Sequence, residues 1–161
     1  MTATRPTPAR IVLPTPEQIL ITREFAAPRH LVFRAYTTPE LVRRWWSAEF
    51  GQTMVAEIDL REGGRWRYVT TTADGDEVGF HGVYREIVPN ERLVMTEVYE
   101  GMPDAQAVNT VTFTENAGRT TLHLLVQHAT QEERDLHLNS GMETGMQQAL
   151  HLLEEVACSL S

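Results

Sequence analysis

The sequence predicts an α+β domain in which a seven-stranded, curved antiparallel sheet wraps around one long C-terminal helix, with two short helices after the first strand. Three observations predict this arrangement. A strand pattern opens the domain, and two short helix patterns follow it. From residue 53 onward, apolar and polar residues alternate through six consecutive segments, as in an antiparallel meander. The last segment carries an apolar stripe at spacings of three and four residues, typical of a helix that covers a sheet.

The segment before the first strand is expected to be a flexible tail. Residues 1–17 contain prolines at positions 6, 8, 14 and 16, and proline lacks the N–H group that regular strand pairing needs. We therefore expect one folded domain over residues 18–161 and a Pro-rich tail that folding does not require. Within the domain, residues 18–27 alternate like a strand, and Pro28 ends that strand and begins the first helix.

Two short helices and six strands are expected in turn. Residues 28–37 show the helical spacing of apolar residues, and Thr38 is a suitable N-cap for a second helix that ends at Trp45 and Trp46. The strands then follow, joined by turns in which Gly, Asn and Asp recur. Their expected ranges are 53–60, 65–72, 78–88, 92–99, 109–115 and 119–129.

The C-terminal segment is predicted to be a single helix from Thr130 to about Ser159, and Thr130 with Glu133 has the spacing of a capping box. At about 1.5 Å per residue, this helix would reach roughly 40 Å and cross the whole sheet. Gly141 and Gly145 lie inside it, which favours either room for a ligand or close packing against the sheet. Its expected buried stripe is Leu138, Met142, Met146, Ala149, Leu150, Leu153, Val156 and Ala157, and its expected exposed residues are Glu132, Arg134, Glu143, Gln147 and Glu154.

Composition excludes several classes of function. The formal net charge is −8, which disfavours nucleic acid and anionic membrane surfaces as partners. All 14 basic residues are Arg, so Schiff-base catalysis and a P-loop are excluded, because both need lysine. The single Cys158 excludes an internal disulfide and fits a cytoplasmic location. No apolar run is long enough to span a membrane, and no secretory signal is recognisable.

Several motifs, taken together, carry a resemblance to a known family: VFRA at 32–35, TPE at 38–40, DLREGGRW at 59–66, GVY at 82–84 and PNERL at 89–93. Over residues 18–157, the chain resembles START-like (SRPBCC) helix-grip domains, in the subgroup similar to the C-terminal domain of the activator of the ninety-kilodalton heat-shock protein ATPase. The resemblance implies the helix-grip fold. Its members include lipid and polyketide binders, cyclases, hormone receptors, co-chaperone-like domains and toxin-resistance proteins. The family usually has Trp after the glycine of the last helix; here Met142 follows Gly141, so we expect a wider or more deformable cavity.

The interior between the sheet and the helix is the expected ligand cavity. Core packing is the alternative role for most of its lining, and Tyr68, Tyr84 and His81 are candidates for orienting a ligand. None of the six histidines has a metal-ligand spacing such as HExxH, so no metal is expected. The sequence also identifies no cofactor and no catalytic residue. The candidate ligand-binding residues are Trp46, Trp66, Tyr68, Phe80, Tyr84, Met95, Leu124, Met142 and Met146.

Three functions stay open on the sequence. The leading hypothesis is non-enzymatic binding of a hydrophobic small molecule or lipid. The second is a chaperone cofactor active in the stress response, which predicts a filled, dry core. The third is a cyclase- or hydrolase-like enzyme, which requires a titratable residue that faces the cavity and has a perturbed pKa. A monomer and a homodimer are both compatible with the sequence.

Overall fold

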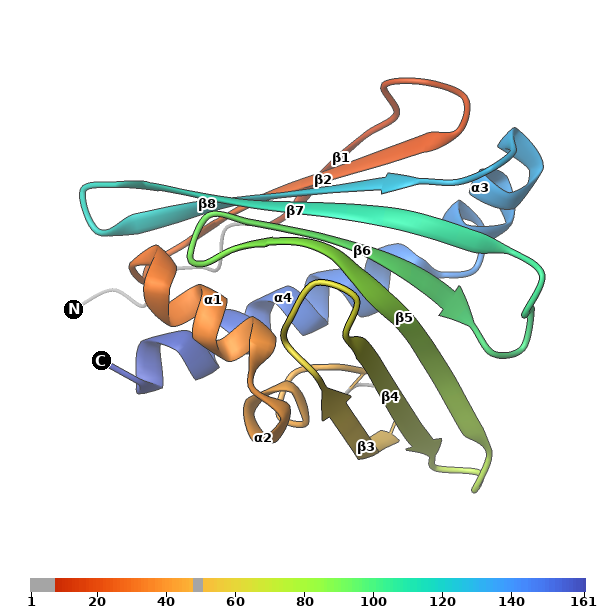
Figure 1. The fold of residues 1–161 in the computed structure, drawn as a ribbon, viewed down its shortest axis with the longest axis horizontal. Helices are drawn as coiled ribbons and strands as arrows, with labels where there is room; N and C mark the ends of the chain where they lie inside the picture. Colours follow the sequence, from red (N-terminus) through yellow and green to blue (C-terminus); the bar gives the residue numbers. More distant parts are fainter. Residues whose placement is uncertain (1–7, 48–50) are drawn as a thin grey trace.

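A computed structural model describes residues 8–47 and 51–161 and shows one strongly curved sheet that arches over the C-terminal helix (Figure 1). The strands are β1 (Arg10–Val12), β2 (Gln18–Phe25), β3 (Gly51–Ile58), β4 (Arg65–Thr72), β5 (Glu77–Val88), β6 (Arg92–Tyr99), β7 (Gln106–Asn116) and β8 (Arg119–Gln127). The helices are α1 (Arg29–Thr37), α2 (Pro39–Val42), α3 (Gln131–Leu138) and α4 (Met142–Ser159).

The strand order is β1-β2-β8-β7-β6-β5-β4-β3, and every neighbouring pair is antiparallel. Strands β3 to β8 form the predicted meander, β2 pairs with β8, and β1 is the edge strand beyond β2. The predicted α+β helix-grip fold is confirmed, with eight strands among the described residues in place of the expected seven. A β-bulge between Tyr84 and Glu86 bends β5, and bulges of this kind increase sheet curvature.

The additional strand corrects the prediction of a tail over residues 1–17. Residues 10–12 pair with β2, with Ile11 opposite Ile21. The Gln147 side chain on α4 also holds the Ala9 backbone, donating to its carbonyl and accepting from its N–H, both at 2.8 Å. Pro8 and Pro14 lie outside the paired residues 10–12, so the N–H groups of residues 10–12 stay available for pairing. Residues 1–7 of the expected tail lie outside the described part of the chain.

The predicted single C-terminal helix is two helices, α3 and α4. Thr130 Oγ1 accepts the N–H of Glu133 at 3.1 Å and caps α3 as predicted. The chain then turns through Gly141, which has φ of 83° and precedes α4. Only glycine adopts this left-handed conformation without a steric cost, so Gly141 separates the helices instead of lying within one. Helix α4 alone spans about 27 Å of the concave side.

The core lies between the concave face of the sheet, α1 and α4 (Figure 1). Helix α4 buries Leu150, Leu153, Val156 and Ala157 there, as the stripe predicted. Arg134 was expected to face water but is buried, and its guanidinium donates to the carbonyls of Thr15 (3.3 Å), before β2, and of Gln18 (3.5 Å), the first residue of β2. Among the residues that the structure describes, no helix is long and apolar enough to cross a membrane.

Candidate functional site

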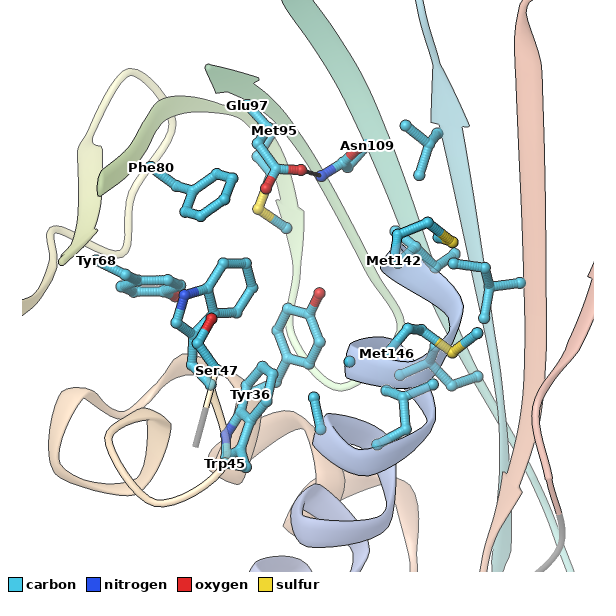
Figure 2. A pocket seen from close by; sticks show the side chains of 18 of the residues that line it. Tyr36, Trp45, Ser47, Tyr68, Phe80, Met95, Glu97, Asn109, Met142 and Met146 are labelled. Carbon is cyan, nitrogen blue, oxygen red and sulfur yellow. Dashed lines mark hydrogen bonds between the residues drawn. The ribbon is translucent and has the colours of Figure 1, made fainter. Parts of the chain in front are cut away.

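A cavity of about 230 Å³ lies between the concave face of the sheet and α4. This volume is just below the ~300–1,000 Å³ of most small-molecule sites. Strands β4 and β5, helix α1 and the segment after α2 supply aromatic side chains, β2 and β8 supply aliphatic side chains, and α4 closes the opposite side (Figure 2). Most of its lining is therefore apolar or aromatic.

Eight of the nine candidate ligand-binding residues line this cavity, namely Trp46, Trp66, Tyr68, Phe80, Met95, Leu124, Met142 and Met146. The ninth, Tyr84, does not line it. This residue is buried in the hydrophobic core and is only 2% exposed. Tyr84 therefore lies in the core behind the lining. Ligand contact by the other eight stays a prediction.

An aromatic cluster forms one end of the cavity. The Trp46 ring centroid lies 4.9 Å from that of Tyr68 and 5.5 Å from that of Phe80, both edge to face. Trp46 Nε1 is buried and has no hydrogen-bond partner among the described residues. In contrast, Trp45, which also borders the cavity, donates its Nε1 to the Ala35 carbonyl at 3.0 Å. Of the two adjacent tryptophans, Trp46 is thus the one with an unused donor.

Helix α4 presents a flexible wall. Met142 and Met146 lie one turn apart and project toward the sheet (Figure 2), and Gly145 lines the cavity between them. Methionine side chains adapt to irregular apolar shapes. Both are only partly buried, whereas Leu153 further along the helix is completely buried. The N-terminal half of α4 therefore lines the cavity, and its C-terminal half packs into the hydrophobic core.

Sequence reasoning missed the polar pair on the sheet wall. Asn109 Nδ2 on β7 donates to Glu97 Oε1 on β6 at 2.8 Å (Figure 2). Burial raises the pKa of Glu97, and the hydrogen bond from Asn109 partly offsets this rise. The alternation of β6 placed Glu97 on the same face as Leu93 and Met95, so a charged residue at an inward position was the available signal. The structure thus supplies a titratable group inside the cavity.

A histidine pair lies beside α3. His128 Nε2 at the end of β8 is 3.0 Å from His137 Nδ1, and His137 lines the cavity. Burial, and secondly the neighbouring His128, lowers the pKa of His137 to about 4. The pair is therefore uncharged at neutral pH. Within residues 8–47 and 51–161, no three His, Cys, Asp or Glu side chains gather as metal ligands.

His81 points away from the cavity, so its suggested role in orienting a ligand there is wrong. Residues alternate across a strand, and His81 lies on the convex face of β5. Its Nδ1 is 2.8 Å from Glu100, whose carboxylate also accepts two hydrogen bonds from Arg67 at 2.8 and 2.9 Å. The Arg67 guanidinium lowers the pKa of Glu100 to about 2. This cluster is a surface ion pair on the outer face of the sheet.

The fold and the position of the cavity define the class of protein: a START-like (SRPBCC) helix-grip domain. Residues 26–157 match the family described as Activator of Hsp90 ATPase homolog 1-like protein, and the chain belongs to this family. No curated protein matches the chain.

Several solved structures share the fold. A protein from Rhodobacter sphaeroides is 26% identical with a TM-score of 0.89, covering 95% of this chain and 99% of that one. Protein Ms6760 from Mycobacterium smegmatis is 24% identical with a TM-score of 0.82, covering 96% and 99%. Protein NE0264 from Nitrosomonas europaea is 24% identical with a TM-score of 0.79, covering 91% and 97%. At these identities the likeness extends to the fold, and function must be argued from the site.

Proposed function

We propose that this domain binds a small, mainly apolar molecule in the cavity between the sheet and α4. The observation that carries the proposal is the cavity of about 230 Å³ with its largely apolar lining. Apolar groups leave water favourably at about 25 cal/mol per Å² of buried surface. An adaptable methionine wall and a few polar groups, among them the Glu97–Asn109 pair, suit a ligand that is held by burial and oriented by few hydrogen bonds.

Probe binding tests this function. N-phenyl-1-naphthylamine, an uncharged apolar dye, is expected to become fluorescent when it enters the cavity. Gly145→Leu places a branched side chain in the cavity between Met142 and Met146, so it should abolish the fluorescence. The variant should stay folded, because the side chain fills existing space and replaces a glycine that costs about 1 kcal/mol in a helix.

The matched control is Gln148→Leu, which adds the same side chain on the exposed face of α4. It should bind the dye like the wild type. Dye binding that survives Gly145→Leu, together with a loss of stability of about 1–3 kcal/mol from overpacking, would show that this region is filled core and would refute the proposal.

Catalysis is the second candidate, and Glu97 favours it. The enzyme hypothesis requires a titratable group in the cavity with a perturbed pKa, and Glu97 meets that requirement.

The chaperone-cofactor hypothesis predicts a filled core, so the cavity disfavours it and its support is the family match. Stimulation of a chaperone ATPase by the purified domain would reinstate it.

A further inference from the structure

We propose that the ligand of this cavity carries a protonated amine, which binds between the Glu97 carboxylate and the Asn109 side-chain oxygen. This inference rests on the proposed function, because it names the chemistry of the ligand in the same cavity. The amine would form the polar end of an otherwise apolar molecule that lies along the aromatic and methionine walls.

Two acceptors lie next to each other on the sheet wall. Asn109 uses its amide N–H to bind Glu97 Oε1, which leaves its Oδ1 available. That oxygen is buried without a hydrogen-bond partner in the described part of the chain, on a side chain that is only 7% exposed. A buried acceptor without a partner destabilises the protein, so a ligand donor at this position would be favourable.

Donor number favours an amine over an alcohol. An ammonium group has three N–H donors, whereas a hydroxyl has one. Of these two groups, only the ammonium can therefore donate hydrogen bonds to Glu97 and Asn109 at the same time. Burial disfavours the charged form of Glu97, and a cation placed beside the carboxyl reverses that effect. The two groups would thus neutralise each other where water is scarce.

The remaining lining favours a cation and disfavours an anion. No arginine of residues 8–47 and 51–161 lines the cavity, and the chain contains no lysine. The basic side chain that does line it, His137, has a lowered pKa and lies against His128. A ligand carboxylate or phosphate would find no countercharge there, and Glu97 would repel it. The rings of Trp46 and Tyr68 can additionally attract a cation through their π faces.

One unpartnered donor, Trp46 Nε1, also belongs to this cavity. It would bind an acceptor atom elsewhere on the ligand, such as an ether or carbonyl oxygen. The net charge of −8 acts at longer range and favours the approach of cationic molecules over anionic ones.

Three ligands with the same apolar tail test the inference: n-octylamine, 1-octanol and octanoate at neutral pH. Each is titrated against the wild-type protein with bound N-phenyl-1-naphthylamine, and displacement of the dye reports affinity. Octylamine should bind at least about tenfold more tightly than octanol, which corresponds to one charge-assisted hydrogen bond. Octanoate should bind most weakly.

Glu97→Gln tests the anchor, because glutamine keeps the shape and can still accept the Asn109 amide but carries no charge. Its octylamine affinity should fall to that of octanol, while octanol affinity stays within about twofold of wild type. The matched control is Glu143→Gln, which removes the same charge from the exposed start of α4. This control should keep the amine preference.

A measurement on the wild-type protein tests the anchor even if Glu97→Gln does not fold. The pKa of Glu97, followed through its side-chain carboxyl ¹³C resonance as the pH is varied, should be lower with octylamine bound than in the free protein, because a neighbouring cation favours the charged carboxylate. Octanol binding that equals or exceeds octylamine binding would overturn the amine assignment and leave the cavity function standing. An amine preference that persists in Glu97→Gln, or a Glu97 pKa that octylamine leaves unchanged, would overturn the assignment of the anchor. Binding of neither the dye nor any of the three ligands would overturn both proposals.

Discussion

At the scale of single residues, Gly82 shows how closely the aromatic wall is fitted to the sheet. Trp66 lies opposite Gly82 in the β4–β5 register, and its Nε1 donates to the Thr96 carbonyl on β6 at 3.1 Å. The indole reaches this carbonyl across the position where Gly82 lacks a side chain. A Cβ at residue 82 would collide with the Thr96 carbonyl oxygen and lie 2.6 Å from Trp66 Nε1. The position of Trp66 in the cavity wall therefore depends on glycine at 82.

Gly82→Ala is expected to lower the free energy of unfolding by about 1–3 kcal/mol, because the methyl group overpacks the sheet and displaces a buried hydrogen bond. Chemical denaturation measures the loss. Gly79→Ala on the same strand is the control, since its methyl would meet only the movable side chain of Glu100. Equal stability of the two variants would contradict this account of Gly82.

At the scale of elements, α4 has two functions along its length. Its first turns border the cavity with Met142 and Met146, and its later turns pack Leu153 and Val156 into the core. Gly141 decides where this helix begins, because its left-handed conformation lets the chain change direction after α3. The break allows α3 to pack beside β2 while α4 crosses beneath the sheet (Figure 1).

Truncations along α4 should follow this division. Leu153→Ala removes a completely buried side chain and should cost about 2–5 kcal/mol. Met146→Ala should cost less, because atoms that line a void have fewer packing partners to lose. Unfolding free energies measure both, and dye displacement should show that Met146→Ala also accepts larger ligands. Equal costs and unchanged ligand size would mean that Met146 is ordinary core.

At the scale of the whole molecule, the histidine pair couples stability to pH. It joins the end of β8 to α3, and the charged groups that influence it are Glu133 and Arg134. The folded-state pKa of His137, about 4, lies below the ordinary value of about 6.5. Between these two values the unfolded chain binds a proton more readily than the folded one, so folding stability decreases as pH falls through this window.

We expect the titration of His137 to lower the free energy of unfolding by on the order of 3 kcal/mol between about pH 6.5 and pH 4. Urea denaturation at several pH values measures this decrease. His137→Gln should reduce it, because glutamine does not titrate. The pKa of Glu100 is lowered to about 2. Its contribution to the free energy of unfolding is therefore lost only as the pH falls below the ordinary glutamate pKa of about 4.3. A decrease of the same size in wild type and His137→Gln would assign the effect to other groups.

The sequence by itself determined the meander, the two short helices, the cap at Thr130 and eight residues of the cavity lining. These features depend on local periodicity, which each strand and helix shows in its own residues.

The sequence did not determine the pairing of Glu97 with Asn109, which are diagonal neighbours only because Met95 lies opposite Asn109 in the β6–β7 register. It also did not determine the strand at residues 10–12, which needs β2 and Gln147 as partners from distant parts of the chain. Only the tertiary structure decided these, because strand register and the burial of polar groups arise from contacts that the folded chain makes between distant residues.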